Sequence, residues 1–469
     1  MIPLPQIKHT VTSLLFLLLT TCTIGPDYKR PTQEVPKTWS NLLEEQKDAT
    51  QTVKWWENFN DPILNQLIDQ VAKQNLDLKG AQALIIQNQA LLKRAEANLF
   101  PLFTLGANAS ANEGSENYYL VRNQRKYNLY TVAPSVSWEL DLFGKLARAK
   151  EAALADLNAQ IATSYGVFLS LVSNVAQTYV RLRTAQNQLK ITRHLCEKYK
   201  AIYDLRRDLK KSGLINQIDV ESSKSVWETY KAMKYPLKAA IKNYMHALSA
   251  LTSQEPTALY ELLNPIGKIP RMDAAVFSGL PSDLLERRPD IQQAEMTLAG
   301  ATARIGVAEG GLYPSFNLTG SIGYQSLNSS NLISSDSLTY SVGPGLTWDI
   351  FDFGRVRDQI LATEALKNNA TLLYRQTILN ALAEVENALV NYANELKKIA
   401  DLEKSKKALQ QVLNLNQSRF DAGLDPVMPT LQAEADFLSK KLDVLGSASN
   451  LALDIINLYK ALGGGWQVL

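Results

Sequence analysis

Cys22 is the residue with the clearest covalent chemistry in this sequence. Lys8 precedes an apolar run over residues 11–19, and the cysteine follows Thr21. A short basic segment, a short apolar segment and a cysteine at the cleavage point are typical of a lipoprotein signal peptide. We therefore predict that residues 1–21 are removed and that the Cys22 thiol carries lipid. The alternative is an ordinary signal peptide that happens to end beside a cysteine.

Few other residues offer catalytic or metal-binding chemistry. One histidine lies in the leader, and the other two, His194 and His246, are far apart in the sequence. Cys196 lies in a helical pattern and is expected to pack in a core. The three glycines at residues 463–465 lack the spacing and the preceding strand of a dinucleotide site. We expect no enzyme activity, no metal and no cofactor.

Composition narrows the class of protein further. The chain has 469 residues, of which 46% are hydrophobic and 20% are charged, so it can bury one large core or several smaller ones. A formal charge of +3 gives no sign of a nucleic-acid surface. No apolar run reaches the roughly 18 residues of a transmembrane helix. Any membrane crossing is therefore expected to use β-strands.

The sequence contains an internal duplication, which sets the expected organisation. Residues 132–144 recur as residues 342–354, with Trp138 matching Trp348 at an offset of 210 (348 − 138 = 210). Upstream, Pro101 matches Pro314 at an offset of 213 (314 − 101 = 213). Two similar halves are the simplest explanation.

Each half contains two segments in which apolar and polar residues alternate, as in β-strands. They cover about 102–111 and 129–140 in the first half, and about 315–325 and 338–349 in the second. Leu105 and Leu318 lie on the apolar side, whereas Thr104 and Asn317 lie on the polar side. Strands of about 10 residues with this pattern suit a transmembrane barrel. A half-buried sheet in a soluble protein is the alternative.

Long helices are expected after the second strand of each half. Residues 144–213 and 354–423 contain no proline, and their apolar residues follow three-four spacing. Each run would form a helix of roughly 100 Å at 1.5 Å per residue. An ordinary coiled coil remains the alternative. Because known transmembrane barrels have at least about eight strands, several chains would have to share one barrel.

The sequence resembles the TolC-like outer-membrane efflux family, specifically its lipoprotein branch of the NodT/OprM type. The resemblance covers essentially the whole mature chain and rests on motifs in a fixed order. These are residues 22–31 (CTIGPDYKRP), the Trp55-Trp56 pair with Asp61-Pro62, residues 280–291 (LPSDLLERRPDI) and residues 458–466 (LYKALGGGW).

This resemblance implies an α+β membrane protein built as a homotrimer. Four strands per chain would contribute to a shared 12-stranded transmembrane β-barrel, continued by a long periplasmic helical coiled-coil barrel. The implied partners are a periplasmic adaptor, a proton-driven inner-membrane pump and outer-membrane lipid. The expected divisions are residues 1–21 (signal peptide), 22–60 (anchor and extended segment), 61–251 (first repeat), 252–279 (equatorial linker) and 280–469 (second repeat).

The resemblance also assigns candidate site residues to the ends of the long helices. The adaptor-contact turns fall on Gly213, Leu214, Gly423 and Leu424. Matched by position, the periplasmic gate falls on Arg419, Phe420, Asp425, Met428 and Gln432. Gln432 stands where the family usually has an acid, and Phe420 stands where it usually has tyrosine.

The implied function is a passive duct in the cell outer membrane, through which an inner-membrane pump expels drugs or other small molecules. Two alternatives stay open at this point. The same duct could serve protein secretion, or the chain could be an envelope lipoprotein that transports nothing.

Overall fold

The computed structural model describes residues 23–32, 34–41, 53–115, 126–272 and 281–468, so the predictions for the leader and Cys22 lie outside the described residues. The chain divides into two compact units. The strand unit comprises Met1–Thr32, Leu84–Ile161 and Gln293–Arg375. The helical unit comprises Gln33–Ala83, Ala162–Gln292 and Gln376–Leu469.

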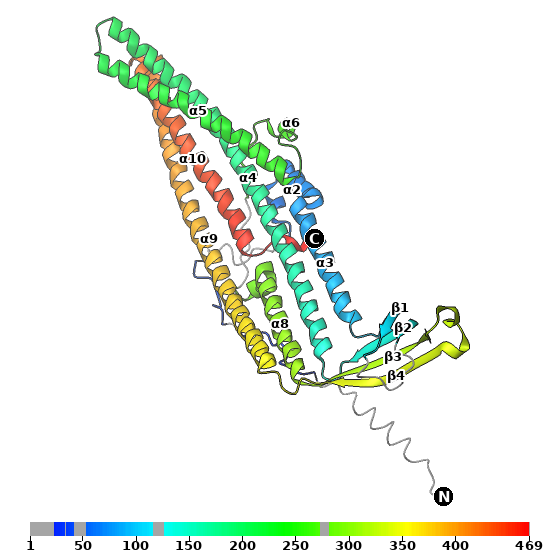
Figure 1. Cartoon of the computed structure of the whole chain (residues 1–469). Coiled ribbons are helices and arrows are strands. Elements are labelled where there is room, and N and C mark those ends of the chain that lie inside the picture. Colours follow the sequence, from blue (N-terminus) through cyan, green and yellow to red (C-terminus); the bar gives the residue numbers. More distant parts are fainter. Residues whose placement is uncertain (1–22, 33, 42–52, 116–125, 273–280, 469) are drawn as a thin grey trace. The chain divides into compact units, whose positions relative to one another are not determined.

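The strand unit contains one antiparallel sheet with the order β1-β2-β3-β4, so β1 and β4 are its edges (Figure 1). The strands are β1 (Leu102–Glu113), β2 (Lys126–Leu140), β3 (Ser315–Ser326) and β4 (Leu338–Thr347). They lie where the alternation of residues predicts strands. One face carries exposed apolar side chains, including Phe103, Leu105 and Val342. Such a face is stable only against lipid or another protein surface.

The strand register repeats the duplication of the sequence. Leu102 of β1 lies opposite Ser137 of β2, and Ser315 of β3 lies opposite Thr347 of β4. The differences are 315 − 102 = 213 and 347 − 137 = 210, the two offsets that relate the halves. The two halves therefore pair their strands in the same register.

The repeated geometry extends to single hydrogen bonds. Trp138 Nε1 donates to the Leu99 carbonyl at 2.9 Å, and Trp348 Nε1 donates to the Leu312 carbonyl at 3.0 Å. These pairs are again related by 210 and 213 residues. The duplication thus holds at the level of individual contacts.

Four helices contribute residues to both units: α3 (Leu76–Ala97), α4 (Lys145–Lys211), α8 (Pro289–Glu309) and α9 (Arg355–Asp421). The two proline-free runs are α4 and α9, each of 67 residues. An aspartate caps the start of each. Asp141 accepts from Ala147 N at 2.7 Å, and Asp352 accepts from Val356 N at 2.8 Å. A carboxylate there satisfies backbone donors that a helix start leaves unpaired.

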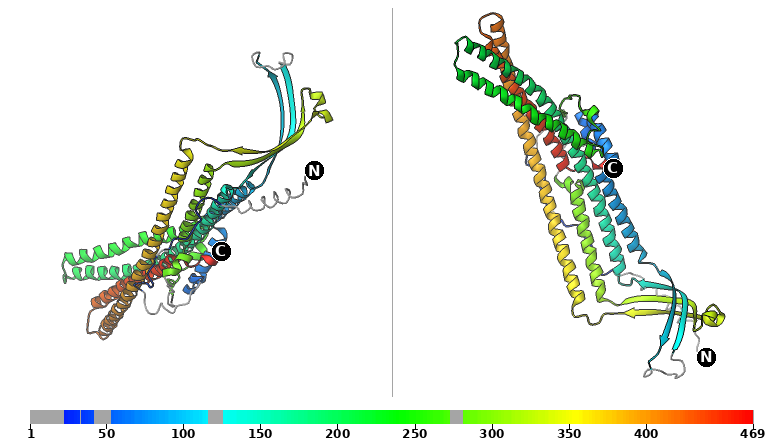
Figure 2. Two further views of the ribbon diagram at one scale, coloured as in Figure 1. Left: turned by 90° about the horizontal axis from the view of Figure 1, so that it is seen from below. Right: turned by 45° about the horizontal axis from the view of Figure 1, so that its top comes forward.

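The helical unit contains α2 (Pro62–Gln74), α5 (Gln217–Leu251) and α10 (Val427–Ala461) together with parts of α4 and α9. The views in Figure 2 show α4 beside α5 and α9 beside α10. The ring of Tyr199 on α4 stacks on Tyr230 of α5 with centroids 4.8 Å apart. Lys198 of α4 is paired with Glu434 of α10 at 2.8 Å.

The apolar faces of α4 and α9 are buried to different extents. On α4, six apolar residues at three-four spacing are all buried: Phe168, Val172, Val175, Tyr179, Leu182 and Leu189. On α9, Val385 and Leu389 are buried, whereas Leu396 and Ile399 are only half-buried in the single chain. Three-four spacing alone therefore identified the helix faces but not their degree of burial.

The tryptophans of the N- and C-terminal motifs stabilise the helical unit. Trp55 is fully buried, stacks on Tyr459 with centroids 5.3 Å apart, and donates from Nε1 to the Gly464 carbonyl at 3.2 Å. Trp466 stacks on Tyr165 at 4.5 Å. These motifs therefore pack distant parts of the chain together.

Short helical segments complete the described chain: η2 (Trp55–Phe59), α6 (Tyr260–Leu263), η3 (Pro281–Asp283), α7 (Leu284–Arg287), η4 (Gly310–Leu312), η5 (Ser329–Asn331), η6 (Ser335–Ser337) and η7 (Trp466–Val468). Cys196 is a buried free thiol. Within the described ranges, no helix combines the length and the apolar character needed to span a membrane.

Candidate functional site

The turn between α4 and α5 contains Gly213, which ends α4. Gly213 has φ of +73°, a left-handed conformation that glycine adopts without steric cost. Its N–H donates to the Lys210 carbonyl at 2.9 Å, and the N–H of Leu214 donates to the Leu209 carbonyl at 3.0 Å. This pair of bonds is the Schellman motif, which satisfies the last carbonyls of a helix.

The turn between α9 and α10 has the same construction. Gly423 has φ of +70°, its N–H donates to the Phe420 carbonyl at 2.9 Å, and the N–H of Leu424 donates to the Arg419 carbonyl at 2.9 Å. Each residue lies 210 positions after its counterpart in the first turn. Both glycines therefore end a long helix.

The two turns differ in how the next helix begins. Asn216 caps α5, with its side chain accepting from Asp219 N at 3.0 Å. Pro426 stands at the corresponding position before α10 and makes no side-chain cap. The second turn has an ion pair instead, because Arg419 donates through Nη2 to Asp425 at 3.0 Å and through Nε to the other carboxylate oxygen. The structure thus joins two of the predicted gate residues.

This ion pair fixes the charge of Asp425. The hydrogen bond from Arg419 and its positive charge lower the pKa of the Asp425 carboxyl. The same contact raises the pKa of Arg419. Both groups are therefore charged at neutral pH, and they neutralise each other locally.

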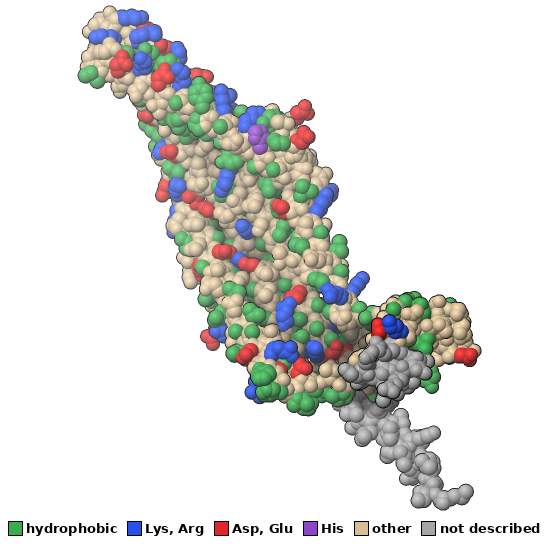
Figure 3. All heavy atoms as spheres, in the orientation of Figure 1, with side chains coloured by type: hydrophobic (Ala, Val, Ile, Leu, Met, Phe, Trp, Pro, Cys, Tyr) green, Lys and Arg blue, Asp and Glu red, His purple; other side chains and the backbone are tan. Residues whose placement is uncertain are grey.

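Exposed leucines mark both turns. Leu214 is 70% exposed and Leu424 is 68% exposed. Figure 3 shows charged side chains of both signs gathered at the end of the helical unit where these turns lie. Two large apolar side chains held in solvent among charged groups are unfavourable unless another surface covers them.

The remaining gate candidates lie close to the second turn in the sequence. Phe420 is exposed in the last turn of α9, Met428 is half-buried in the first turn of α10, and Gln432 is exposed one turn later. The Gln432 side chain donates to Asp436 Oδ1 at 3.0 Å. Their predicted role in narrowing a duct stays a prediction.

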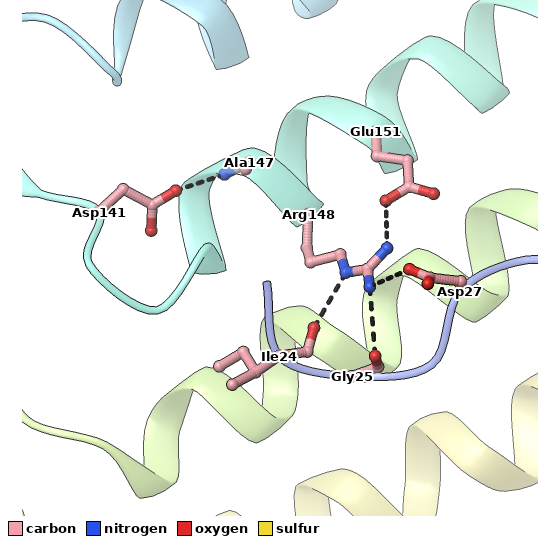
Figure 4. A network of polar contacts seen from close by, with 7 residues as sticks. All are labelled: Ile24, Gly25, Asp27, Asp141, Ala147, Arg148 and Glu151. Carbon is pink, nitrogen blue, oxygen red and sulfur yellow. Dashed lines mark hydrogen bonds and ion pairs between the residues drawn. The ribbon is translucent and has the colours of Figure 1, made fainter. Parts of the chain in front are cut away.

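A second cluster, which the sequence did not reveal, holds the segment that follows Cys22 (Figure 4). The Arg148 side chain is only 5% exposed. It donates to the Ile24 carbonyl at 2.9 Å, to the Gly25 carbonyl at 3.2 Å and to Asp27 at 2.6 Å. Glu151, one turn along α4, accepts from Arg148 at 2.6 Å. We call these five residues the Arg148 cluster.

Close backbone packing completes this attachment. Ile24 N donates to the Phe143 carbonyl at 3.1 Å. Gly25 has φ of +86°, and a Cβ built on it would lie 2.3 Å from the Cα of Gly306 in α8. Only glycine fits there. The Gly25-Pro26 motif was the one sequence signal of this constraint, because Arg148 itself lies in an unbroken helical pattern.

Solved structures with this fold are outer-membrane channels. The outer-membrane channel OprN matches with a TM-score of 0.88 at 31% identity, covering 95% of this chain and 100% of that chain. The open state of the Neisseria gonorrhoeae MtrE outer membrane channel matches with a TM-score of 0.81 at 26% identity, covering 95% of this chain and 99% of that chain. The mostly helical fold with four strands is thus that of TolC-like outer-membrane channels.

A family model described as outer membrane efflux protein matches residues 67–254 and 280–464, and the chain belongs to this family. One relative is the toluene efflux pump outer membrane protein TtgI of Pseudomonas putida, 29% identical over 96% of this chain and 97% of the relative. Nodulation protein T of Rhizobium leguminosarum bv. trifolii is 28% identical over 97% of both chains. The protein is an outer-membrane efflux channel, and the solved structures reported above are channels.

Proposed function

We propose that this chain is the outer-membrane exit duct of a tripartite efflux system, through which drugs or similar small molecules leave the cell. A periplasmic adaptor and a proton-driven inner-membrane pump are its partners in this proposal. Relatives named as toluene and solvent efflux pump outer membrane proteins, similar over nearly their whole length, support this class of cargo. The duct itself is passive, so the pump supplies the energy.

The duct is proposed to be a homotrimer. Four strands per chain are too few to close a transmembrane barrel, and three copies would supply twelve. The exposed apolar face of the sheet would then contact lipid, and the opposite face of the sheet would line the lumen. Light scattering of the detergent-purified protein tests this assembly. A folded, monodisperse monomer would contradict it.

Cys22 is proposed to carry the lipid anchor. The observation that supports this is the Arg148 cluster, which fastens residues 24–27 of the chain directly after the cysteine. An anchor attached there would be held by the folded protein and not by a loose tail. Mass spectrometry of the mature N-terminus should find lipid on Cys22, and an unmodified Cys22 with cleavage elsewhere would exclude the anchor.

The two turns at Gly213 and Gly423 are proposed as the adaptor contact, and opening is proposed to require movement of the helices around Met428. The observation that supports this is that both turns end the preceding helix with the same pair of hydrogen bonds and each presents an exposed leucine. Arg419, Phe420, Asp425 and Gln432 would lie at the same constriction.

A valine substitution at Gly423 tests the adaptor contact. A Cβ at Gly423 would meet no atom within 4 Å, so Gly423→Val fits the space, although the left-handed backbone disfavours it. We expect Gly423→Val to abolish efflux while the membrane level of the protein stays close to wild type. Gly446→Val controls for the added side-chain volume alone, because a Cβ on Gly446, in the interior of α10, is equally free of contacts but the backbone there is not left-handed. Full efflux by a normally accumulating Gly423→Val protein would refute the contact.

A further inference from the structure

In each half of the duplication, the residue directly before the helix that leads into the sheet contacts the last residue of the helix that ends the half. Asn75, before α3, donates through Nδ2 to the Leu251 carbonyl at the end of α5, at 2.8 Å. Arg288, before α8, donates through Nη1 to the Ala461 carbonyl at the end of α10, at 2.7 Å (Figure 1). The differences are 288 − 75 = 213 and 461 − 251 = 210, the two offsets that relate the halves.

The ends of α5 and α10 are otherwise closed in the same way. Ser253 has φ of +56° and Gly463 has φ of +68°, both left-handed. The Schellman pair of hydrogen bonds ends each helix and satisfies the carbonyls of Ser249 and Ala250 in α5, and those of Tyr459 and Lys460 in α10. The last carbonyl of each helix lies outside this pair, and a side chain satisfies it.

Arg288 makes further contacts through its charge. Its side chain is 9% exposed and donates to both carboxylate oxygens of Asp290, at 3.0 and 2.7 Å. Its Nη2 also lies 2.8 Å from Glu384 Oε2 on α9. The first half has Asn75 in place of Arg288 and Asn174 in place of Glu384 (384 − 210 = 174), so this ion pair has no counterpart there. We call the residues of the second half the Arg288 cluster: Arg288, Asp290, Glu384 and Ala461.

The Arg288 cluster joins three helices of the helical unit at one guanidinium. Asp290 lies at the start of α8, Glu384 lies on α9, and Ala461 ends α10. Glu384 lies 39 residues before Gly423 (423 − 384 = 39), and Ala461 lies 38 residues after it (461 − 423 = 38). The cluster therefore holds α9 and α10 together at the base of their hairpin, opposite the Gly423 turn.

The α4–α5 hairpin is held by stacked aromatic rings as well. Tyr199 stacks on Tyr230 with centroids 4.8 Å apart, and Tyr203 stacks on Trp227 with centroids 5.5 Å apart. The residues 210 positions later are Leu409, Leu413, Phe437 and Lys440. Only one of these four has an aromatic ring, so the same stacking cannot form in the α9–α10 hairpin. That hairpin therefore depends more on the contacts at its base.

We infer that Arg288 is a positioning residue for the gate: it fixes the directions of α9 and α10 at their base and so holds the helices around Met428 in the closed position. Met428 lies 33 residues before Ala461 in α10 (461 − 428 = 33), roughly 50 Å along a helix. A small change of direction at Ala461 therefore moves Met428 by a larger distance. The inference rests on the proposed gate around Met428 and adds the contact that positions it.

Glu384→Ala tests the inference, because it removes the contact to α9 and leaves Arg288 paired with Asp290 and bonded to Ala461. Glu384 is 57% exposed, so we expect a normal membrane level and an unchanged oligomer by light scattering. The open probability of single channels in planar bilayers should rise roughly two- to fivefold, the range that a partly exposed ion pair supports.

Glu386→Ala is the matched control on the same helix. It also removes one carboxylate from α9, but Glu386 accepts from Ser40 N at 2.7 Å and from the Asn41 side chain at 2.8 Å, in the N-terminal segment. Its open probability should stay at the wild-type value. An equal rise in both variants would show that loss of any α9 carboxylate loosens the gate, and would overturn the role of Arg288.

A double-mutant cycle tests whether Glu384 acts through Arg288. Arg288→Asn places the residue of the first half at this position and should also raise the open probability. Adding Glu384→Ala to Arg288→Asn should then change nothing more, because both residues act through one contact. Additive effects would overturn the inference. If Arg288→Asn does not accumulate, the comparison of Glu384→Ala with Glu386→Ala decides.

The remaining outcomes separate this inference from the proposed function. A Glu384→Ala channel that conducts with the wild-type open probability would overturn the positioning role and leave the duct intact. A wild-type protein that forms no channel in bilayers would overturn the proposed duct, and the inference with it.

Discussion

The charges at the second helical turn belong to a closed ion pair. Asp425 receives two hydrogen bonds from Arg419, which lowers the pKa of its carboxyl. A carboxylate with a lowered pKa loses its contribution to stability only when the pH falls through that lowered value. At neutral pH the pair adds almost no net charge to a duct, and Gln432 adds none.

Ion selectivity should therefore change in opposite directions when either member of the pair is removed. We expect weak cation selectivity in the wild-type channel and a shift toward anions in Asp425→Asn, because that variant leaves the Arg419 guanidinium unpaired. Arg419→Gln should increase cation selectivity, because it leaves the Asp425 carboxylate unpaired. Reversal potentials of single channels in a salt gradient measure this. Strong wild-type selectivity that disappears in Asp425→Asn would show that Asp425 acts as a free charge.

Asp454 on α10 should make stability depend on pH. Burial, together with the nearby Glu395 carboxylate, raises the pKa of the Asp454 carboxyl to about 6. The folded protein then binds this proton more tightly than the unfolded chain, so stability should fall as pH rises from about 4 through 6. Asp454→Asn removes this titration. We expect it to stabilise the protein at pH 8 by on the order of 1 kcal/mol, after allowance for solvent screening, and much less at about pH 4. Thermal midpoints at both pH values measure the difference, and equal gains would contradict it.

At the scale of elements, one side chain of α4 makes three polar contacts to the segment after Cys22. The planar guanidinium of Arg148 reaches two backbone carbonyls and two carboxylates at once, which a lysine ammonium cannot reproduce. The Ile24 and Gly25 carbonyls would lose their partner if Arg148 were replaced. The cluster therefore couples the N-terminal segment to the start of α4.

Arg148→Lys should release this segment. We expect a loss of about 1–3 kcal/mol in the free energy of attachment, from hydrogen bonds to charged donors that are no longer made. Hydrogen exchange of residues 23–31 should become faster. Arg304→Lys is the control, since Arg304 forms a more exposed pair with Asp156 on the same unit. Unchanged exchange in Arg148→Lys would show that the backbone packing at Gly25 suffices.

The strands should show a difference between the two faces of the sheet. Leu105→Arg places a charge on the face proposed to contact lipid, at a cost of roughly 2–4 kcal/mol near the middle of the membrane. Thr104→Arg places the same charge on the alternate face, where Thr104 hydrogen-bonds to Ser135 at 2.7 Å. We expect fewer assembled channels for Leu105→Arg than for Thr104→Arg on a semi-native gel. Equal assembly would contradict the assignment of the faces.

For the whole molecule, the duplication made much of the fold predictable. The repeated tryptophan and proline positions located the strands, and the proline-free runs located α4 and α9. The Arg148 cluster was not predictable, because Arg148 donates to the carbonyl groups of residues more than 120 positions away in the sequence. In the helical pattern of α4, an arginine at this position looks like an ordinary solvent-exposed residue. Likewise, the same sequence pattern gave a half-buried Phe143 and an exposed Phe353. Burial depends on tertiary neighbours, and some neighbours proposed here belong to other copies.

Efflux by the intact system is the most direct test of the proposed function. Cells that lack this chain should accumulate a panel of small-molecule dyes and drugs to the level of cells that lack the cognate pump. Expression of the wild-type chain should restore low accumulation. If deletion leaves every compound unchanged but removes proteins from the medium, the duct serves protein secretion, and the proposed role in small-molecule efflux is wrong.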